Sequence, residues 1–177
     1  MSGGAGLAER VRRAALLEGD FVLSSGERSR FYVDKYLFST EPELLWELAG
    51  ALAERLPGGI DRLAGVELGA VPLVVALSLR TGLPYVIVRR GVKEYGTARS
   101  VEGRLSEGER LVLVEDVVTT GTQALQAARG LVGAGCEVRK LLAVLDRRED
   151  PEGAAGETLE EFSFEALLRM ADLGVTT

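Results

Sequence analysis

The sequence predicts an α/β fold in which a central, mostly parallel sheet is flanked by helices. Two observations lead to this prediction. Segments with helical periodicity alternate with short, strongly apolar segments along the chain, as in proteins that build parallel sheets from βαβ units. The length of 177 residues fits one domain with a sizeable core, so we expect a single domain over residues 1–177.

Four segments have apolar residues spaced as on one face of a helix. Helices are predicted over residues 7–17, 41–56, 72–82 and 122–132. The first is expected to stop at Gly19. Pro42 suits the first turn of the second, and Gly82 closes the third.

Strands are predicted over residues 62–66, 85–89, 111–115 and 138–145. Three segments fall outside this sheet. Residues 20–38 are typical of a short hairpin, and residues 162–173 of a small strand followed by a helix. The polar, glycine-rich connection 91–108 is longer than a simple loop between two elements, which indicates a function of its own.

Composition excludes several classes of function. The net charge of −6 argues against a surface that binds DNA or RNA. The chain has no histidine, which removes histidine metal ligands and histidine general bases. The single cysteine, Cys136, is expected to be a small buried residue, with a reactive thiol as the alternative. Because no apolar run approaches a signal peptide or a membrane span, we expect a cytoplasmic protein without a membrane partner.

The segment 111–122, LVLVEDVVTTGT, joins a buried strand to a helix through a polar turn. Glu115 and Asp116 follow the apolar run, at the end of the strand where open α/β sheets bind ligands. Their oxygens can accept hydrogen bonds from ribose hydroxyls or bind Mg²⁺, directly or through water. The turn 119–122 offers N–H groups and hydroxyls at a helix N-terminus, which suits a phosphate. An exposed strand end followed by a helix cap is the alternative.

Residues 115–122 resemble the donor-binding motif of the type I phosphoribosyltransferases. The resemblance implies that family's fold, Mg²⁺ as cofactor and 5-phosphoribosyl-1-diphosphate (PRPP) as donor. It also implies that Glu115 and Asp116 hold the ribose hydroxyls, with Asp116 as a catalytic residue. The residues expected to surround the 5′-phosphate and complete the PRPP site are Val117, Val118, Thr119, Thr120, Gly121 and Thr122.

Other segments resemble the orotate phosphoribosyltransferase family, and together with the donor motif they span nearly the whole chain. Residues 21–34, FVLSSGERSRFYVD, are similar to the hood that covers the pyrimidine ring. The resemblance implies that Tyr32, Val33 and Thr119 bind orotate. Arg147, at the end of a strand, would bind the orotate carboxylate, which a guanidinium can contact through two hydrogen bonds. An ordinary hairpin and a surface arginine are the alternatives.

Residues 88–96, VRRGVKEYG, resemble the start of that family's mobile catalytic loop, here about residues 90–108. The resemblance implies that Arg89, Arg90 and Lys93 contact the diphosphate, with Arg89 and Lys93 as catalytic residues. It further implies a homodimer in which this loop closes over the partner's site. A solvated basic run would explain the charges but not the length or the glycine content.

The resemblance divides the domain into a hood, about residues 1–40 plus the C-terminal tail, and a core of about residues 41–150. The sequence departs from the family at three positions. Ser24 and Gly69 stand where the family often has lysine, and Tyr95 where it often has histidine. The predicted site is therefore poorer in cations than in many relatives.

The implied reaction is attack of orotate N1 on the anomeric carbon of PRPP as diphosphate leaves. Two alternatives remain from the residues alone: a phosphoribosyltransferase for uracil or a purine, and a PRPP-binding transcription regulator. Arg147 argues against the first alternative, because a base without a carboxylate does not require this arginine. The second alternative requires a DNA-binding element. The segment before the hood is too short for one, and the net charge is negative.

Overall fold

The computed structural model describes residues 3–22, 26, 28–90, 100–148 and 159–175. Within these residues the main sheet has the order β5-β4-β3-β6-β7-β8. The bounds are β3 Arg62–Val66, β4 Tyr85–Val88, β5 Val101–Glu102, β6 Arg110–Val118, β7 Glu137–Asp146 and β8 Glu165–Arg169. All neighbours pair in parallel except β5, which is antiparallel to β4. The predicted mostly parallel sheet is confirmed.

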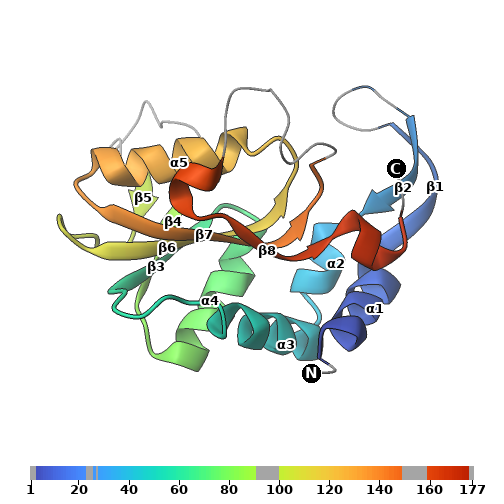
Figure 1. The fold of residues 1–177 in the computed structure, drawn as a ribbon, viewed down its shortest axis with the longest axis horizontal. Coiled ribbons are helices and arrows are strands. Elements are labelled where there is room, and N and C mark those ends of the chain that lie inside the picture. Colours follow the sequence, from blue (N-terminus) through green and yellow to red (C-terminus); the bar gives the residue numbers. More distant parts are fainter. Residues whose placement is uncertain (1–2, 23–25, 27, 91–99, 149–158, 176–177) are drawn as a thin grey trace.

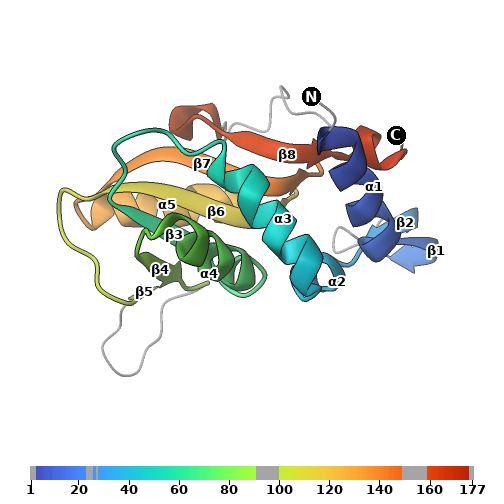
Figure 2. The same ribbon diagram turned by 90° about the horizontal axis from the view of Figure 1, so that it is seen from below.

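Helices cover both faces of the sheet. Helices α3 (Pro42–Ala53) and α4 (Ala70–Thr81) lie on one face, and α5 (Thr122–Gly133) lies on the other (Figures 1 and 2). Because helices cover both faces of the sheet, the central strand β6 has apolar side chains on both of its faces. Its side chains alternate, so that Val112 and Val114 pack with α3 and α4, while Leu111 and Leu113 pack with α5.

The N-terminal part stands beside one end of the sheet (Figure 1). It comprises α1 (Gly3–Ala15), the antiparallel hairpin of β1 (Leu16–Val22) and β2 (Arg28–Val33), and the short helix α2 (Lys35–Ser39). The 3-10 turn η2 (Met170–Leu173) packs against α1, so this late element lies beside the first helix. The other 3-10 turn, η1 (Leu159–Phe162), precedes β8.

The prediction of a helix over 7–17 was wrong at its C-terminal end. Helix α1 ends at Ala15, and Leu16 and Leu17 belong to β1, where they pair with Val33 and Tyr32. Their pairing with a distant strand outweighs their local helical spacing. Gly19 therefore does not stop a helix but lies inside β1, between the residues where the register shifts.

The other predicted helices are confirmed within three residues at each end, and Gly82 closes α4 with a φ of 74°. Among the strands, 62–66 is as predicted, whereas 111–115 was too short. Because β6 pairs with β7 as far as Val118, the two acids lie inside the strand. Residues 91–99 lie outside the described residues. Part of the remaining connection, Val101–Glu102, joins the sheet, as does strand β8 of the tail.

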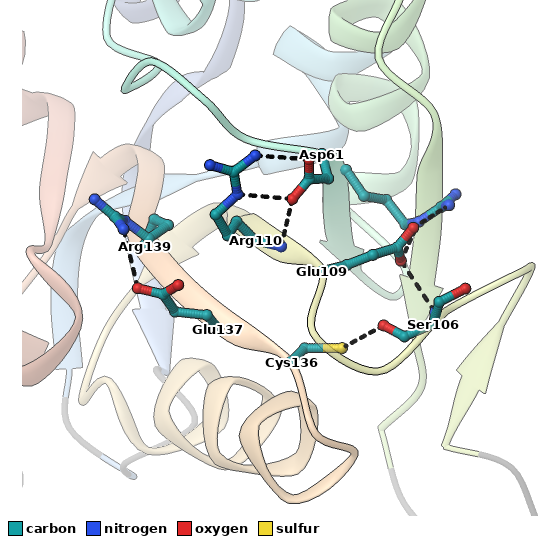
Figure 3. Close-up of polar contacts among 8 residues, drawn as sticks. Asp61, Ser106, Glu109, Arg110, Cys136, Glu137 and Arg139 are labelled. Atoms are coloured by element: carbon teal, nitrogen blue, oxygen red, sulfur yellow. Dashed lines mark hydrogen bonds and ion pairs between the residues drawn. The ribbon is translucent and has the colours of Figure 1, made fainter.

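Two ion pairs join the amino ends of the neighbouring strands β3 and β6, and a third lies within β7 (Figure 3). Arg110 Nε lies 2.8 Å from Asp61 Oδ2, and Arg62 Nη2 lies 2.7 Å from Glu109 Oε1. Cys136, 6% exposed, donates from Sγ to the Ser106 carbonyl at 3.4 Å. Burial raises the pKa of this thiol, so the structure supports the buried, unreactive interpretation of Cys136.

Candidate active site

The candidate site lies at the opposite edge of the sheet, where β3, β4, β6 and β7 have their carboxyl ends. These strands are parallel neighbours, so the segments that follow them converge at one edge. They are the turn 67–69 after β3, Arg89 and Arg90 after β4, the turn 119–121 after β6, and Arg147 after β7. Open α/β sheets bind their ligands outside this edge.

The two acids of β6 are both buried, at 2% exposure for Glu115 and 0% for Asp116. Asp116 Oδ1 accepts a hydrogen bond from the N–H of Val117 at 2.6 Å. Its Oδ2 lies 2.9 Å from Nζ of Lys35, in an ion pair whose angles do not make a hydrogen bond. Glu115 Oε2 has no hydrogen-bond partner among the described residues. Buried carboxylate oxygens with unused lone pairs are suited to a ligand that brings donors.

Burial, together with the negative charge of Asp116, raises the pKa of Glu115 to about 8. Arg90 and Lys35 act in the opposite direction. Glu115 is therefore partly protonated near neutral pH, and it can both donate to and accept from a hydroxyl group.

The turn after β3 leaves room for Asp116. Gly69 precedes α4, and a Cβ atom at this position would lie 1.5 Å from Asp116 Oδ2. Any side chain at position 69 would force that carboxylate to move. The peptide bond between Glu67 and Leu68, in the same turn, is cis.

The turn after β6 has the form expected of a phosphate site. Thr119 and Thr120 are exposed, and Gly121 has a φ of 86°, in the left-handed region that favours glycine. Helix α5 begins at Thr122, whose N–H donates to Thr120 Oγ1 at 3.3 Å. The N–H groups of the first turn and two hydroxyls are thereby gathered at the positive end of a 12-residue helix.

Arg89 and Arg90, which follow β4, both contact Glu67 in the turn after β3. Glu67 Oε1 accepts a hydrogen bond from the N–H of Arg90 at 2.6 Å. Glu67 Oε2 lies 3.6 Å from Nε of Arg89, whose Nη1 lies 3.2 Å from Oε1 of Glu102. The third predicted cation, Lys93, lies outside the described residues.

The adjacent arginines after β7 differ in what they contact. Arg148 donates from Nε and Nη2 to the buried carboxylate of Asp146, at 2.9 and 2.8 Å, and its guanidinium lies over the Phe164 ring. Among the described residues, the side chain of Arg147 has no hydrogen bond or ion pair, while its N–H donates to the Val118 carbonyl at 2.8 Å. Within the described part of the chain, Arg147 is therefore the one of these two arginines whose guanidinium is not bound to a carboxylate.

The two predicted ring-contacting residues of β2 point in opposite directions. The side chain of Val33, 4% exposed, packs into the core, so only its backbone could meet a ligand. Tyr32 is 40% exposed and its ring centroid lies 5.5 Å from that of Phe21. Residues 23–25 and 27, at the tip of the hairpin, lie outside the described residues.

The chemistry of the donor set limits how a metal could bind. Among the described residues, no cluster of three or more His, Cys, Asp or Glu side chains is placed to hold a metal ion. Glu115 and Asp116 supply hard oxygen atoms, the ligands that Mg²⁺ prefers, but two carboxylates do not fill its six positions. They fit a Mg²⁺ ion that keeps its waters or takes its other ligands from a bound phosphate compound.

Sequence reasoning missed two residues of this site. Lys35, the ion-pair partner of Asp116, comes from the N-terminal part, and Glu67 holds Arg89 and Arg90. Lys35 was recognisable only as a basic residue directly after the hairpin. Nothing in the local pattern connects it with an acid 81 positions away (116 − 35), because that proximity arises from tertiary packing.

The parallel sheet, the acid pair and the phosphate-type turn are those of a phosphoribosyl-transferring domain. Residues 43–157 match the phosphoribosyl transferase domain family. The orotate phosphoribosyltransferase of Halobacterium salinarum is 46% identical over 170 residues, covering 94% of this chain and 94% of its own.

Solved structures agree. That of Mycobacterium tuberculosis orotate phosphoribosyltransferase in complex with Fe(III) dicitrate is 32% identical with a TM-score of 0.82, over 98% of this chain and 99% of its own. The same enzyme in complex with PRPP gives 27% and 0.77, over 98% and 99%. The chain belongs to the orotate phosphoribosyltransferase family.

No helix among the described residues combines the length and the apolar character that crossing a membrane requires.

Proposed function

We infer that this protein is an enzyme that transfers the 5-phosphoribosyl group of PRPP to N1 of orotate, with orotidine 5′-monophosphate and diphosphate as products. The observation that carries this conclusion is the match to orotate phosphoribosyltransferases over 94% of both chains. It favours orotate over uracil, a purine or a regulatory role. The reaction belongs to the biosynthesis of pyrimidine nucleotides.

The geometry suits the donor at the carboxyl edge of the sheet. Glu115 and Asp116 would accept hydrogen bonds from the ribose hydroxyls, since both have lone pairs unused by the described residues. The end of β6 from Val117, the turn after it and the start of α5 at Thr122 would hold the 5′-phosphate. The N–H groups and hydroxyls of the turn lie at the N-terminus of α5, where a negative group is stabilised.

Arg147 would select the base. Its N–H is bonded to the carbonyl of Val118, so its side chain starts beside the donor turn, and its guanidinium has no partner among the described residues. A guanidinium and a carboxylate make two parallel hydrogen bonds. Thr119, the backbone of Val33 and the exposed Tyr32 would complete the orotate site.

During the reaction positive charge grows on the ribose ring and negative charge on the diphosphate. Arg89, Arg90 and Lys93 would stabilise the leaving diphosphate, and Glu67 would support this role through its ion pair with the Arg89 side chain and its hydrogen bond to the backbone N–H of Arg90. Mg²⁺, held near Glu115 and Asp116 through water and by the donor itself, would supply further positive charge to the phosphate oxygens. Asp116 would act by holding the ribose while the bond to diphosphate breaks.

The remaining expectations stay proposals from the sequence. They are a homodimer in which the loop of about residues 90–108 closes over the partner's site, and a hood of about residues 1–40 with the tail. They also include a cytoplasmic location without nucleic-acid or membrane partners. Loop closure would exclude water, which competes with orotate for the ribosyl centre.

The test is the absorbance of orotate over time, with purified protein, PRPP and Mg²⁺. Parallel reactions contain uracil, adenine or guanine in place of orotate. We expect orotate to be consumed only when PRPP and Mg²⁺ are both present. Turnover of another base, without loss of orotate, would contradict the orotate assignment and leave the PRPP site. No turnover of any base would favour the regulatory alternative.

A further inference from the structure

Lys35 connects the N-terminal part of the chain with the acid pair of β6. Its Nζ lies 2.9 Å from Asp116 Oδ2, and its side chain is 25% exposed while that of Asp116 is fully buried. Among the described residues, it is the one basic side chain that forms an ion pair with Asp116. A partly buried pair of this kind is screened less by solvent than a pair on the surface.

The backbone on both sides of Lys35 is fixed. Asp34 caps helix α2: its Oδ1 accepts a hydrogen bond from the N–H of Tyr36 at 3.0 Å, and its own N–H donates to the Ala15 carbonyl at 2.9 Å. Lys35 is the first residue of that helix. Its side chain therefore starts from a defined place next to the hairpin rather than from a free loop.

The place that Asp116 occupies exists because residue 69 is a glycine. The same oxygen that faces Lys35 would lie 1.5 Å from a Cβ atom at Gly69. Lys35 and Gly69 thus define the position of one carboxylate oxygen, and the N–H of Val117 defines the other at 2.6 Å. A carboxylate has about four acceptor sites, so two contacts leave it able to accept further hydrogen bonds.

The negative charges at the carboxyl ends of the parallel strands favour a cation nearby. Glu115 and Asp116 are consecutive buried residues of β6, and the proposed donor adds a phosphate and a diphosphate. An unpaired buried carboxylate is strongly disfavoured and would turn toward any available donor. The ammonium of Lys35 offsets this charge from the side of the hood.

We propose that Lys35 is a positioning residue of the donor site, which holds the Asp116 carboxylate in the space left by Gly69, in the orientation that accepts the ribose hydroxyls of PRPP. The proposal rests on the proposed function, because it assigns the ribose to Asp116. It makes the hood part of the donor site as well as of the base site. Movement of the hairpin or of α2 would then alter PRPP binding through this one contact.

The test is PRPP binding by isothermal titration calorimetry with Mg²⁺, on the full chain, together with KM and kcat. The variants are Lys35→Met, Lys35→Arg and, as a matched control, Lys140→Met. Lys140 is also a partly buried lysine, 19% exposed, with Nζ 2.6 Å from Oε2 of Glu165, but it lies in β7 before the buried run 141–146. It has no contact with the acid pair.

We expect Lys35→Met to weaken PRPP binding by roughly tenfold, the scale of losing one partly buried ion pair, and to raise the KM for PRPP in parallel. Lys35→Arg should recover most of the affinity, and Lys140→Met should bind like the wild type. Affinity within about twofold of the wild type in Lys35→Met, or an equal loss in Lys140→Met, would overturn the proposal. Failure of the wild type to bind PRPP would instead reject the proposed function.

A double-mutant cycle gives an independent measurement. Gly69→Ala should weaken PRPP binding in the wild-type background, because its methyl group displaces the carboxylate. The same substitution should have less effect when Lys35 has already been replaced, since the two act on one oxygen. Equal effects in both backgrounds would contradict the inference. Circular dichroism checks that each variant is folded, and Lys35→Gln replaces Lys35→Met if the latter is not.

Discussion

The N–H of Arg147 donates to the carbonyl of Val118 at 2.8 Å, which joins the residue after β7 to the end of β6. The next residue, Arg148, is bound to the buried carboxylate of Asp146. Two adjacent arginines thus have different surroundings. Within the described residues, the guanidinium of Arg147 has no bonded partner, and that of Arg148 binds a carboxylate at the strand end.

These surroundings predict different phenotypes. We expect Arg147→Ala to raise the KM for orotate by roughly 10- to 100-fold, the scale of a lost charge-assisted contact, with a smaller change in the KM for PRPP. Arg148→Ala should chiefly lower the free energy of unfolding, because it leaves the buried carboxylate of Asp146 without its ion-pair partner and with only the backbone N–H of residue 148 as donor among the described residues. Steady-state kinetics and urea unfolding of both variants separate the effects. Unaltered orotate affinity in Arg147→Ala would show that the carboxylate binds elsewhere.

Glu67 is predicted to support the diphosphate site through the residues that it holds. Glu67→Ala removes the acceptor of the Arg90 N–H and one partner of Arg89, so the KM for PRPP should rise by roughly tenfold. Glu102→Ala is the control, because it removes only the more exposed partner of Arg89. A similar KM in both variants would mean that Glu67 has no special role.

Lys93 lies outside the described residues, and its role is predicted from the sequence alone. Lys93→Ala should lower kcat by roughly 10²–10³, the scale for loss of one group that stabilises the transition state. Arg104→Ala, at an exposed position later in the same connection, should keep kcat near the wild-type value. A near-normal kcat in Lys93→Ala would remove this residue from the mechanism.

Glu115 predicts how stability depends on pH. Its folded-state pKa, about 8, lies above the ordinary value of 4.5, so the folded protein retains a proton that the unfolded chain releases. This contribution to stability is complete below pH 4.5 and is lost as the pH rises through about 8. Within that window the free energy of unfolding should fall by up to about 1.4 kcal/mol per pH unit.

The measurement is urea unfolding at several pH values across this window, for the wild type and Glu115→Gln. The variant carries no titrating group at this position, so its stability should change less with pH. Identical slopes for the two proteins would mean that Glu115 titrates near its ordinary pKa.

Replacement of Gly65, which lies outside the candidate site, is predicted to lower the stability of the fold. A Cβ atom there would lie 2.6 Å from Val74 Cγ1, because β3 and α4 pack closely at this point. Gly65→Ala should lower the free energy of unfolding by about 1–3 kcal/mol, as overpacking does. Gly130→Ala, in α5 with no atom within 4 Å of its Cβ, should raise it by up to about 1 kcal/mol. Equal effects of the two substitutions in thermal or urea unfolding would contradict the close packing at Gly65.

The sequence by itself determined the alternation of helices and strands and the position of the motif that contains Glu115 and Asp116 at the carboxyl end of a strand; the role of Arg147 stays a prediction from the sequence. These features depend on residues close together in the chain, where periodicity and short motifs are visible. The same reasoning misplaced the end of the first helix. Leu16 and Leu17 have helical spacing, but they pair with a strand that begins at Arg28.

Only the tertiary structure decided which groups act on the acid pair. The ion pair of Lys35 with Asp116 and the space at Gly69 each join segments far apart in the sequence. The raised pKa of Glu115 arises from burial, which depends on the packing of the whole domain. Charge, burial and close approach are properties of neighbours in space, and folding brings together neighbours that no local pattern in the sequence identifies.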